Sequence, residues 1–121
     1  MNTDPQQRLQ ALTDQLVTAL EDKKAAEILT IDVQGRCSFS DRFVLANARN
    51  GRHLKALSQA VAGVGHQFDL PATVEGMTAL EWLVVDLQDV IVHLFLPDIR
   101  EQFQLERLWQ QPTMSGNDPS E

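Results

Sequence analysis

Two adjacent β-rich runs, residues 81–86 and 89–95, constrain the fold more than any other feature of this 121-residue chain. Only a tight turn separates them, and neighbouring strands joined by a short turn pair antiparallel. Because side chains alternate along a strand, one face of this predicted hairpin is wholly aliphatic. Such a face belongs to a hydrophobic core, and it carries Leu83, Val85, Val90, Val92 and Leu94.

The other face of the hairpin mixes aromatic, aliphatic and acidic side chains. With Leu87-Gln88 as a two-residue turn, Trp82 faces His93 and Val84 faces Ile91. A mixed face is either covered by a helix of the same domain or open as a docking surface. Tryptophan is enriched where interfaces gain most of their binding energy. The residues alone leave the two explanations equally open for Trp82, Val84, Asp86, Asp89, Ile91, His93 and Phe95.

Helical periodicity occurs on both sides of the hairpin. Thr3-Asp4-Pro5 predicts a helix start, and leucines then recur at helical spacing to about residue 23. A second amphipathic helix begins after a turn at residues 47–51 and is predicted to close at Gly63 and Gly65. Pro97-Asp98 predicts the start of a short third helix, whose apolar side is Ile99, Phe103, Leu105, Leu108 and Trp109.

Three further strands complete the predicted order. Residues 27–33 and 39–46 read as strands, and residues 68–74 hold a short or edge strand because Pro71 interrupts them. The order α-β-β-α-β-β-β-α predicts an α/β fold with a mixed sheet of about five strands flanked by helices. We expect one domain over residues 1–109 and a disordered tail over the polar residues 110–121.

Charge is unevenly distributed in this chain, whose net charge is −7. Residues 36–55 hold five basic side chains against one acid, whereas residues 69–106 hold eight acids against one arginine. Repulsion from phosphates therefore predicts little or no direct nucleic-acid binding by the chain as a whole. The acidic half would suit a basic partner, although a plain solvated surface explains the same charges.

The compartment is expected to be the cytoplasm. Cys37 is the only cysteine, so no disulfide forms within one chain, and a reducing environment is the natural expectation. The polar N-terminus has no apolar signal region, and no apolar stretch is long enough to cross a membrane.

A search for catalytic groups predicts no enzyme, no cofactor and no metal. His53, His66 and His93 lack the spacing of metal ligands with Cys37, and no phosphate-binding loop is present. Four aspartates lie near strand ends, but no Asp-x-Asp pair occurs for two-metal chemistry. The alternatives to a binding protein of one defined partner are a degenerate metal-dependent nucleotidyltransferase and an interaction module for some other protein.

Five segments, taken in this order, resemble those of the ribosomal silencing factor RsfS family, also called Iojap-like. They are IDVQGRCSFSD at residues 31–41, Arg52-His53, Glu75-Gly76, WLVVDLQDVIVH at residues 82–93 and LERLW at residues 105–109. The resemblance spans about Leu9 to Trp109, nearly the whole predicted domain. Each segment alone is weakly specific, whereas the ordered combination is highly specific.

The resemblance implies a nucleotidyltransferase-like topology without the activity. It also implies binding to the large ribosomal subunit through large-subunit ribosomal protein fourteen, which blocks association with the small subunit. Translation would fall when nutrients are scarce, and a homodimer is possible when the ribosome is absent. The docking tryptophan of the family corresponds to Trp82, and by position the surface extends to Val84, Asp86, Leu87, Ile91 and His93.

Two positions depart from the pattern of the family. Gln88 stands where many members have glycine, which adopts the positive φ of a tight hairpin turn without strain. The turn type, and with it the pairing around Trp82, therefore depends on the conformation of Gln88. Cys37 stands where serine is usual, a small-for-small exchange with little expected consequence.

Overall fold

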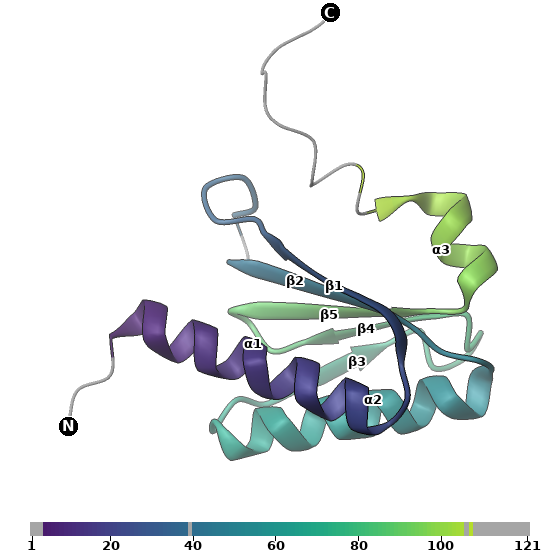
Figure 1. Cartoon of the computed structure of the whole chain (residues 1–121), viewed down its shortest axis with the longest axis horizontal. Helices are drawn as coiled ribbons and strands as arrows, with labels where there is room; N and C mark the ends of the chain where they lie inside the picture. The colour runs from purple at the N-terminus through teal and green to yellow at the C-terminus, as the bar shows by residue number, and fades with distance from the viewer. Residues whose placement is uncertain (1–3, 39, 106, 108–121) are drawn as a thin grey trace, which may run out of the picture.

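The computed structural model describes residues 4–38, 40–105 and 107. Its element order confirms the predicted one (Figure 1). Antiparallel pairing joins all neighbouring strands of the five-stranded sheet except β2 and β5, which are parallel, and the strand order is β1-β2-β5-β4-β3. The elements are α1 (Pro5–Asp22), β1 (Ala26–Asp32), β2 (Arg42–Asn47), α2 (Gly51–Gln67), β3 (Thr73–Glu75), β4 (Trp82–Asp86), β5 (Val90–Phe95) and α3 (Pro97–Phe103).

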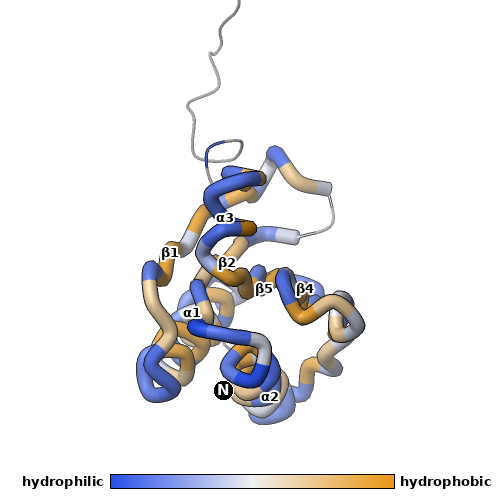
Figure 2. Tube along the Cα trace, turned by 90° about the vertical axis from the view of Figure 1, so that its right-hand side faces the viewer, coloured by the Kyte–Doolittle hydropathy of each residue, from blue (hydrophilic) through white to orange (hydrophobic). Residues whose placement is uncertain are grey.

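The main core lies between one face of the sheet and the helices α1 and α2 (Figure 1). The leucines of α1 and the apolar stripe of α2 pack on the aliphatic face of the β4–β5 hairpin, as the alternation of side chains predicted. The short α3 lies on the opposite side of the sheet, and the hydrophobic strands run between these layers (Figure 2). A smaller core cluster on that opposite side includes Phe43, Ile91 and Phe95.

The starts of both long helices follow from their capping residues. Asp4 caps α1 by accepting a hydrogen bond from the Gln6 N–H, and Pro5 occupies the first helical position, as predicted. Asn50 caps α2 in the same way, since its side chain accepts from the His53 N–H at 2.9 Å.

The predicted end of α2 at Gly63 and Gly65 is wrong, because the helix continues to Gln67. Gly65 is buried, and a Cβ atom there would lie 2.7 Å from the Leu87 Cδ2. This glycine therefore lets the helix approach the hairpin closely and does not end the helix. One other boundary differs less, because β2 begins at Arg42, three residues after the predicted start. The predicted tail at residues 110–121 lies outside the described residues.

The predicted register of the β4–β5 hairpin is also wrong. Trp82 pairs with Phe95 and Val84 with His93, so each partner lies two residues further along than predicted. The turn is centred on Gln88, whose φ is +75°, and the Asp89 N–H donates to the Leu87 carbonyl at 3.0 Å. This γ-turn hydrogen bond lies inside a connection that the Leu87 N–H closes by donating to the Val90 carbonyl at 3.0 Å, so residues 88–89 join the strands instead of the predicted 87–88. Because a two-residue shift preserves alternation, every side chain keeps its predicted face.

Candidate functional site

The outer face of the sheet is only partly covered. Val84 of β4 lies between Glu75 of β3 and His93 of β5, and residues paired in this way point to the same side of the sheet. The β3–β4 half of this face is partly open to solvent, whereas the side chains of the neighbouring strand β5 are buried. We call this open surface the tryptophan face, and it comprises Thr73, Glu75, Trp82, Val84, Asp86 and Phe103.

Trp82 is the largest side chain of the tryptophan face and is half-buried. Its ring lies 5.0 Å from that of Phe95 in the sheet and 5.2 Å from that of Phe103 in α3. Phe103 itself is 54% exposed, so one side of its ring contacts Trp82 and the rest faces solvent. The two rings therefore form an aromatic pair that is fixed on its inner side by the sheet and open on its outer side.

Gly76 positions the backbone at the start of β4. Its φ is +97°, and a Cβ atom there would lie 2.2 Å from the carbonyl oxygen of Trp82. Only glycine fits this close approach, since both the backbone conformation and the space exclude a side chain. The Glu75-Gly76 pair noted in the sequence thus holds the β3–β4 loop against the backbone of the tryptophan.

His93 of the neighbouring strand β5 fixes the orientation of the indole. The Trp82 Nε1–H donates a hydrogen bond to the His93 Nδ1 at 3.2 Å, and Phe43 packs edge-on against the imidazole at 4.9 Å. Burial of the ring lowers the pKa of His93 from 6.5 to about 4, so the side chain is neutral near pH 7 and its Nδ1 accepts. Among the described residues, no group pairs with the His93 Nε2.

The structure brings five of the six residues expected at the docking surface to one face. Trp82, Val84 and Asp86 lie along β4, and Ile91 and His93 lie beside them in the neighbouring strand β5 with 5% and 8% of their area exposed. Leu87 does not join them, because its side chain is fully buried in the main core.

Phe103, Glu75 and Thr73 belong to this face but were not predicted to do so. The sequence pattern predicts Phe103 on the apolar side of the final helix, because its spacing is also that of a packed residue. Its contact with Trp82 depends on the angle between β5 and α3, and no local sequence pattern specifies this angle. Glu75 and Thr73 come to the face only through the pairing of β3 with β4.

Carboxylates border the apolar part of the tryptophan face. Glu75 and Asp86 are both exposed, and they lie on neighbouring strands around Val84. Asp86 has a second role, since its carboxylate accepts a hydrogen bond from the Gln88 N–H at 2.7 Å and supports the turn. An apolar centre with an acidic border suits a partner that presents a basic surface around an apolar pocket.

Other chemistry finds little support in residues 4–38, 40–105 and 107. Within these ranges no group of three His, Cys, Asp or Glu side chains is placed to hold a metal ion. The same ranges contain no helix that combines the length and apolar character needed to cross a membrane. Cys37 is buried, and both ring nitrogens of His53 are engaged by backbone groups.

Comparisons with known proteins agree on one family. Residues 6–120 match the family model described as ribosomal silencing factor during starvation. A ribosomal silencing factor RsfS of Zymomonas mobilis is 36% identical over 107 residues, which cover 88% of this chain and 77% of the relative. A mouse protein named mitochondrial assembly of ribosomal large subunit protein 1 is 33% identical over 100 residues, 79% of this chain and 44% of that protein.

A solved structure supports the same assignment. A crystal structure of a protein from Chromobacterium violaceum superposes with a TM-score of 0.79 at 31% identity, over 93% of this chain and 90% of that one. Because the family model covers nearly the whole chain and the relatives match it in sequence and in fold, the chain belongs to the ribosomal silencing factor family.

Proposed function

We propose that this protein binds the large ribosomal subunit through large-subunit ribosomal protein fourteen and sterically blocks association with the small subunit. The observation that carries the proposal is the partly exposed aromatic pair formed by Trp82 of the sheet and Phe103 of α3. The family supports a role in silencing ribosomes, and the name of the mouse relative refers to the large subunit. Translation would fall under nutrient limitation, and the protein would act in the cytoplasm.

The aromatic pair has the properties of an energetic anchor. Tryptophan is enriched among residues whose truncation costs an interface about 2 kcal/mol or more. Here the indole is held in place before binding by the sheet and by the hydrogen bond to His93. A preorganised side chain loses little conformational entropy on docking, so more of its contact energy appears as affinity.

The acidic border of the tryptophan face favours a basic protein as the partner. Ribosomal proteins are mostly basic, and Glu75 and Asp86 would face such a surface around the docked tryptophan. Complementary charges at the border of an interface accelerate encounter and disfavour wrong partners. Ribosomal protein fourteen is the partner that the family resemblance names.

The proposed mechanism needs no catalytic group. A body of 13.6 kDa fixed at the face where the subunits meet would exclude the other subunit by its volume alone. No described feature favours the degenerate nucleotidyltransferase, whose magnesium would need converging carboxylates.

Co-sedimentation with purified large subunits tests the proposal. Wild type should pellet with large subunits and prevent added small subunits from joining them, whereas Phe103→Ala and Trp82→Ala should each weaken pelleting by about 30-fold, equivalent to about 2 kcal/mol. Gln67→Ala, at the exposed C-terminal end of α2 on the other side of the sheet, is the matched control and should bind like wild type.

Circular dichroism of each variant shows whether it is folded. Phe103 is the decisive position, because its exposed side chain contributes little to the core. The proposal fails if wild type does not pellet with large subunits, or if a folded Phe103→Ala protein binds as tightly as the control.

The same face offers a surface for self-association when no ribosome is present. Two copies could bury their aromatic pairs against each other around a two-fold axis. We expect sedimentation equilibrium to show a dimer that Phe103→Ala weakens and that isolated large subunits dissociate. A monomer at all concentrations would refute this part of the proposal.

A further inference from the structure

The segment from β2 through α2 carries positive charge only. Residues 42–68 contain no aspartate or glutamate, although the chain as a whole has a net charge of −7. Arg49, Arg52 and Lys55 are all exposed and follow one another at the beginning of α2. A cation in the first turn of a helix opposes the helix dipole, so these side chains do not serve the stability of α2.

His53 brings a second pair of cations to this place. Its Nδ1 accepts a hydrogen bond from the Arg49 N–H at 2.9 Å, and its Nε2–H donates to the Lys23 carbonyl at 2.7 Å. The imidazole is buried and therefore clamps the end of α1 against the beginning of α2. Lys23 and Lys24, both exposed, are thereby held beside Arg49 and Arg52.

Five of the ten basic residues of the chain thus meet at one corner of the fold. We call Lys23, Lys24, Arg49, Arg52 and Lys55 the cationic corner. Glu21 and Asp22 precede the two lysines and offset part of their charge. The two arginines and Lys55 have no such neighbours in sequence, because the nearest acids are Asp41 and Asp69.

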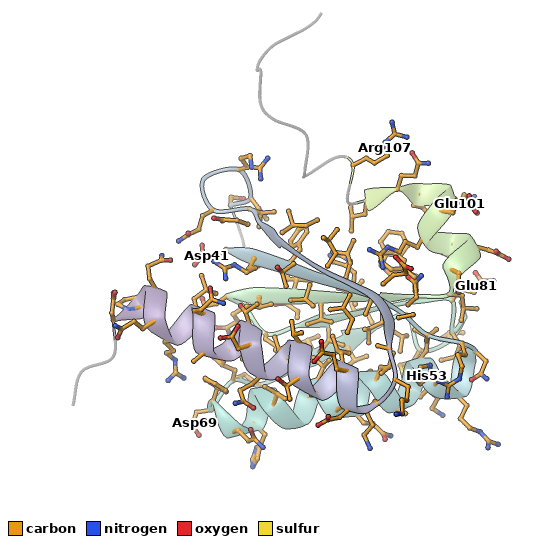
Figure 3. The ribbon with its side chains drawn as sticks, in the orientation of Figure 1. Asp41, His53, Asp69, Glu81, Glu101 and Arg107 are labelled. Atoms are coloured by element: carbon orange, nitrogen blue, oxygen red, sulfur yellow. The ribbon has the colours of Figure 1, made fainter. Side chains whose placement is uncertain are left out.

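The cationic corner adjoins the tryptophan face. Leu80, two residues before Trp82, lies in a shallow hollow with Arg52 and Lys55, and it would contact a Cβ atom at Gly51 at 3.3 Å. Figure 3 shows His53 of α2 and Glu81 beside β4 at the same end of the molecule. A large partner that docks on the tryptophan therefore also comes close to these cations.

We propose that the cationic corner binds the phosphate backbone of ribosomal RNA next to the protein on which the tryptophan face docks. The inference rests on the proposed function, which brings the molecule to a particle rich in RNA. Exposed cations that are spread over two adjacent elements match the charges of a nucleic-acid backbone, which attracts Lys and Arg without reading sequence. A membrane surface fits less well, since apolar side chains that could insert are lacking beside the described cations, apart from the half-buried Leu80.

This inference refines the expectation drawn from net charge. An overall charge of −7 repels RNA from most of the surface, including the acidic border of the tryptophan face. The one corner that attracts phosphate would then act only when the tryptophan face has already docked. Two weak and different contacts would fix the orientation of the molecule better than either contact alone.

The salt dependence of binding to purified large subunits tests the inference. Each phosphate contact contributes about 0.7 to 0.9 to the slope of log affinity against log salt. Arg52→Gln should reduce that slope by about one and weaken binding about fivefold at 0.15 M salt. Adding Lys55→Gln should reduce the slope further. The matched control is Arg36→Gln, which removes one exposed arginine from the loop at the far end of the sheet and should leave the slope unchanged (Figure 1).

Binding to isolated ribosomal protein fourteen separates the two proposals. Arg52→Gln should bind the isolated protein like wild type, because no RNA is present, whereas Trp82→Ala should bind it more weakly. Arg52→Gln could instead lose the same affinity for isolated ribosomal protein fourteen as for large subunits. This result would show that the cationic corner contacts an acidic protein surface, and it would overturn the RNA assignment. If wild type pellets with large subunits and Arg52→Gln shows the same salt slope as wild type, only the proposed RNA contact of the cationic corner is refuted. If wild type does not pellet, the proposed function is refuted.

Discussion

A buried histidine should make this fold less stable in weakly acidic solution. Burial lowers the pKa of His93 from 6.5 to about 4, so the unfolded chain takes up a proton well before the folded chain does. Stability that depends on the neutral ring is complete above pH 6.5 and is lost as the pH falls towards about 4. At about 1.4 kcal/mol for each pH unit, the loss over this interval is about 3 kcal/mol.

The aromatic surroundings of the ring explain the direction of this effect. Phe43 and Phe95 pack against the imidazole and offer no carboxylate to stabilise the imidazolium. Protonation would also place a hydrogen on the His93 Nδ1, opposite the Nε1–H of Trp82. Acid therefore opposes both the folded state and the hydrogen bond that orients the indole of Trp82.

Urea denaturation of wild type and of His93→Gln isolates this contribution. Glutamine retains an acceptor for the indole but does not titrate. The free energy of unfolding of His93→Gln should therefore be lower than that of wild type near neutral pH, and the difference should be much smaller near pH 4. The stability difference between the two proteins should shrink by about 3 kcal/mol across the interval. His66→Gln, which removes an exposed histidine from α2, serves as the matched control. A difference between wild type and His93→Gln that stays constant with pH would refute the reasoning.

Two further substitutions test the local geometry of the hairpin. Gln88→Gly should stabilise the protein by about 1 kcal/mol, because glycine adopts the φ of +75° at this position without the strain of a side chain; thermal denaturation should show a higher midpoint, and an unchanged or lower one would contradict the assigned turn. Leu87→Ala should destabilise the fold by about 2 to 5 kcal/mol in urea, because it removes a fully buried core side chain. The folded Leu87→Ala protein should still bind large subunits like wild type, and a selective loss of binding would return this residue to the docking surface.

The faces of the hairpin could be predicted from the sequence, but its register could not. Alternation alone assigns Leu83 and Val85 to the core and Trp82 and Val84 to the other side, and the structure confirms this. The register depends on the turn, and the turn depends on a positive φ at Gln88 that the residue type does not favour. A residue with positive φ in a tight turn is the kind of feature at which local propensity fails.

The other differences have a common physical origin in close tertiary approach. A glycine near the end of an apolar stripe is typical of a helix end, yet Gly65 serves the packing of Leu87 on α2. Phe103 has the spacing of a core residue, yet it lies exposed beside Trp82. In both cases a partner distant in sequence decides the role of the residue, and a pattern within one element carries no information about that partner.

The distribution of charge over the surface, more than the net charge, favours one binding orientation of this molecule. The acids border the tryptophan face through β3 and β4, whereas the segment from β2 through α2 carries cations only. Both regions reach the same end of the sheet, because Gly51 of α2 approaches Leu80 just before β4. A partner that combines a basic protein with exposed phosphate would meet complementary charge on both sides of Trp82. A wrongly rotated molecule would bring acids towards phosphate and cations towards the basic protein, so the same two charge patterns that favour one orientation also oppose its reverse.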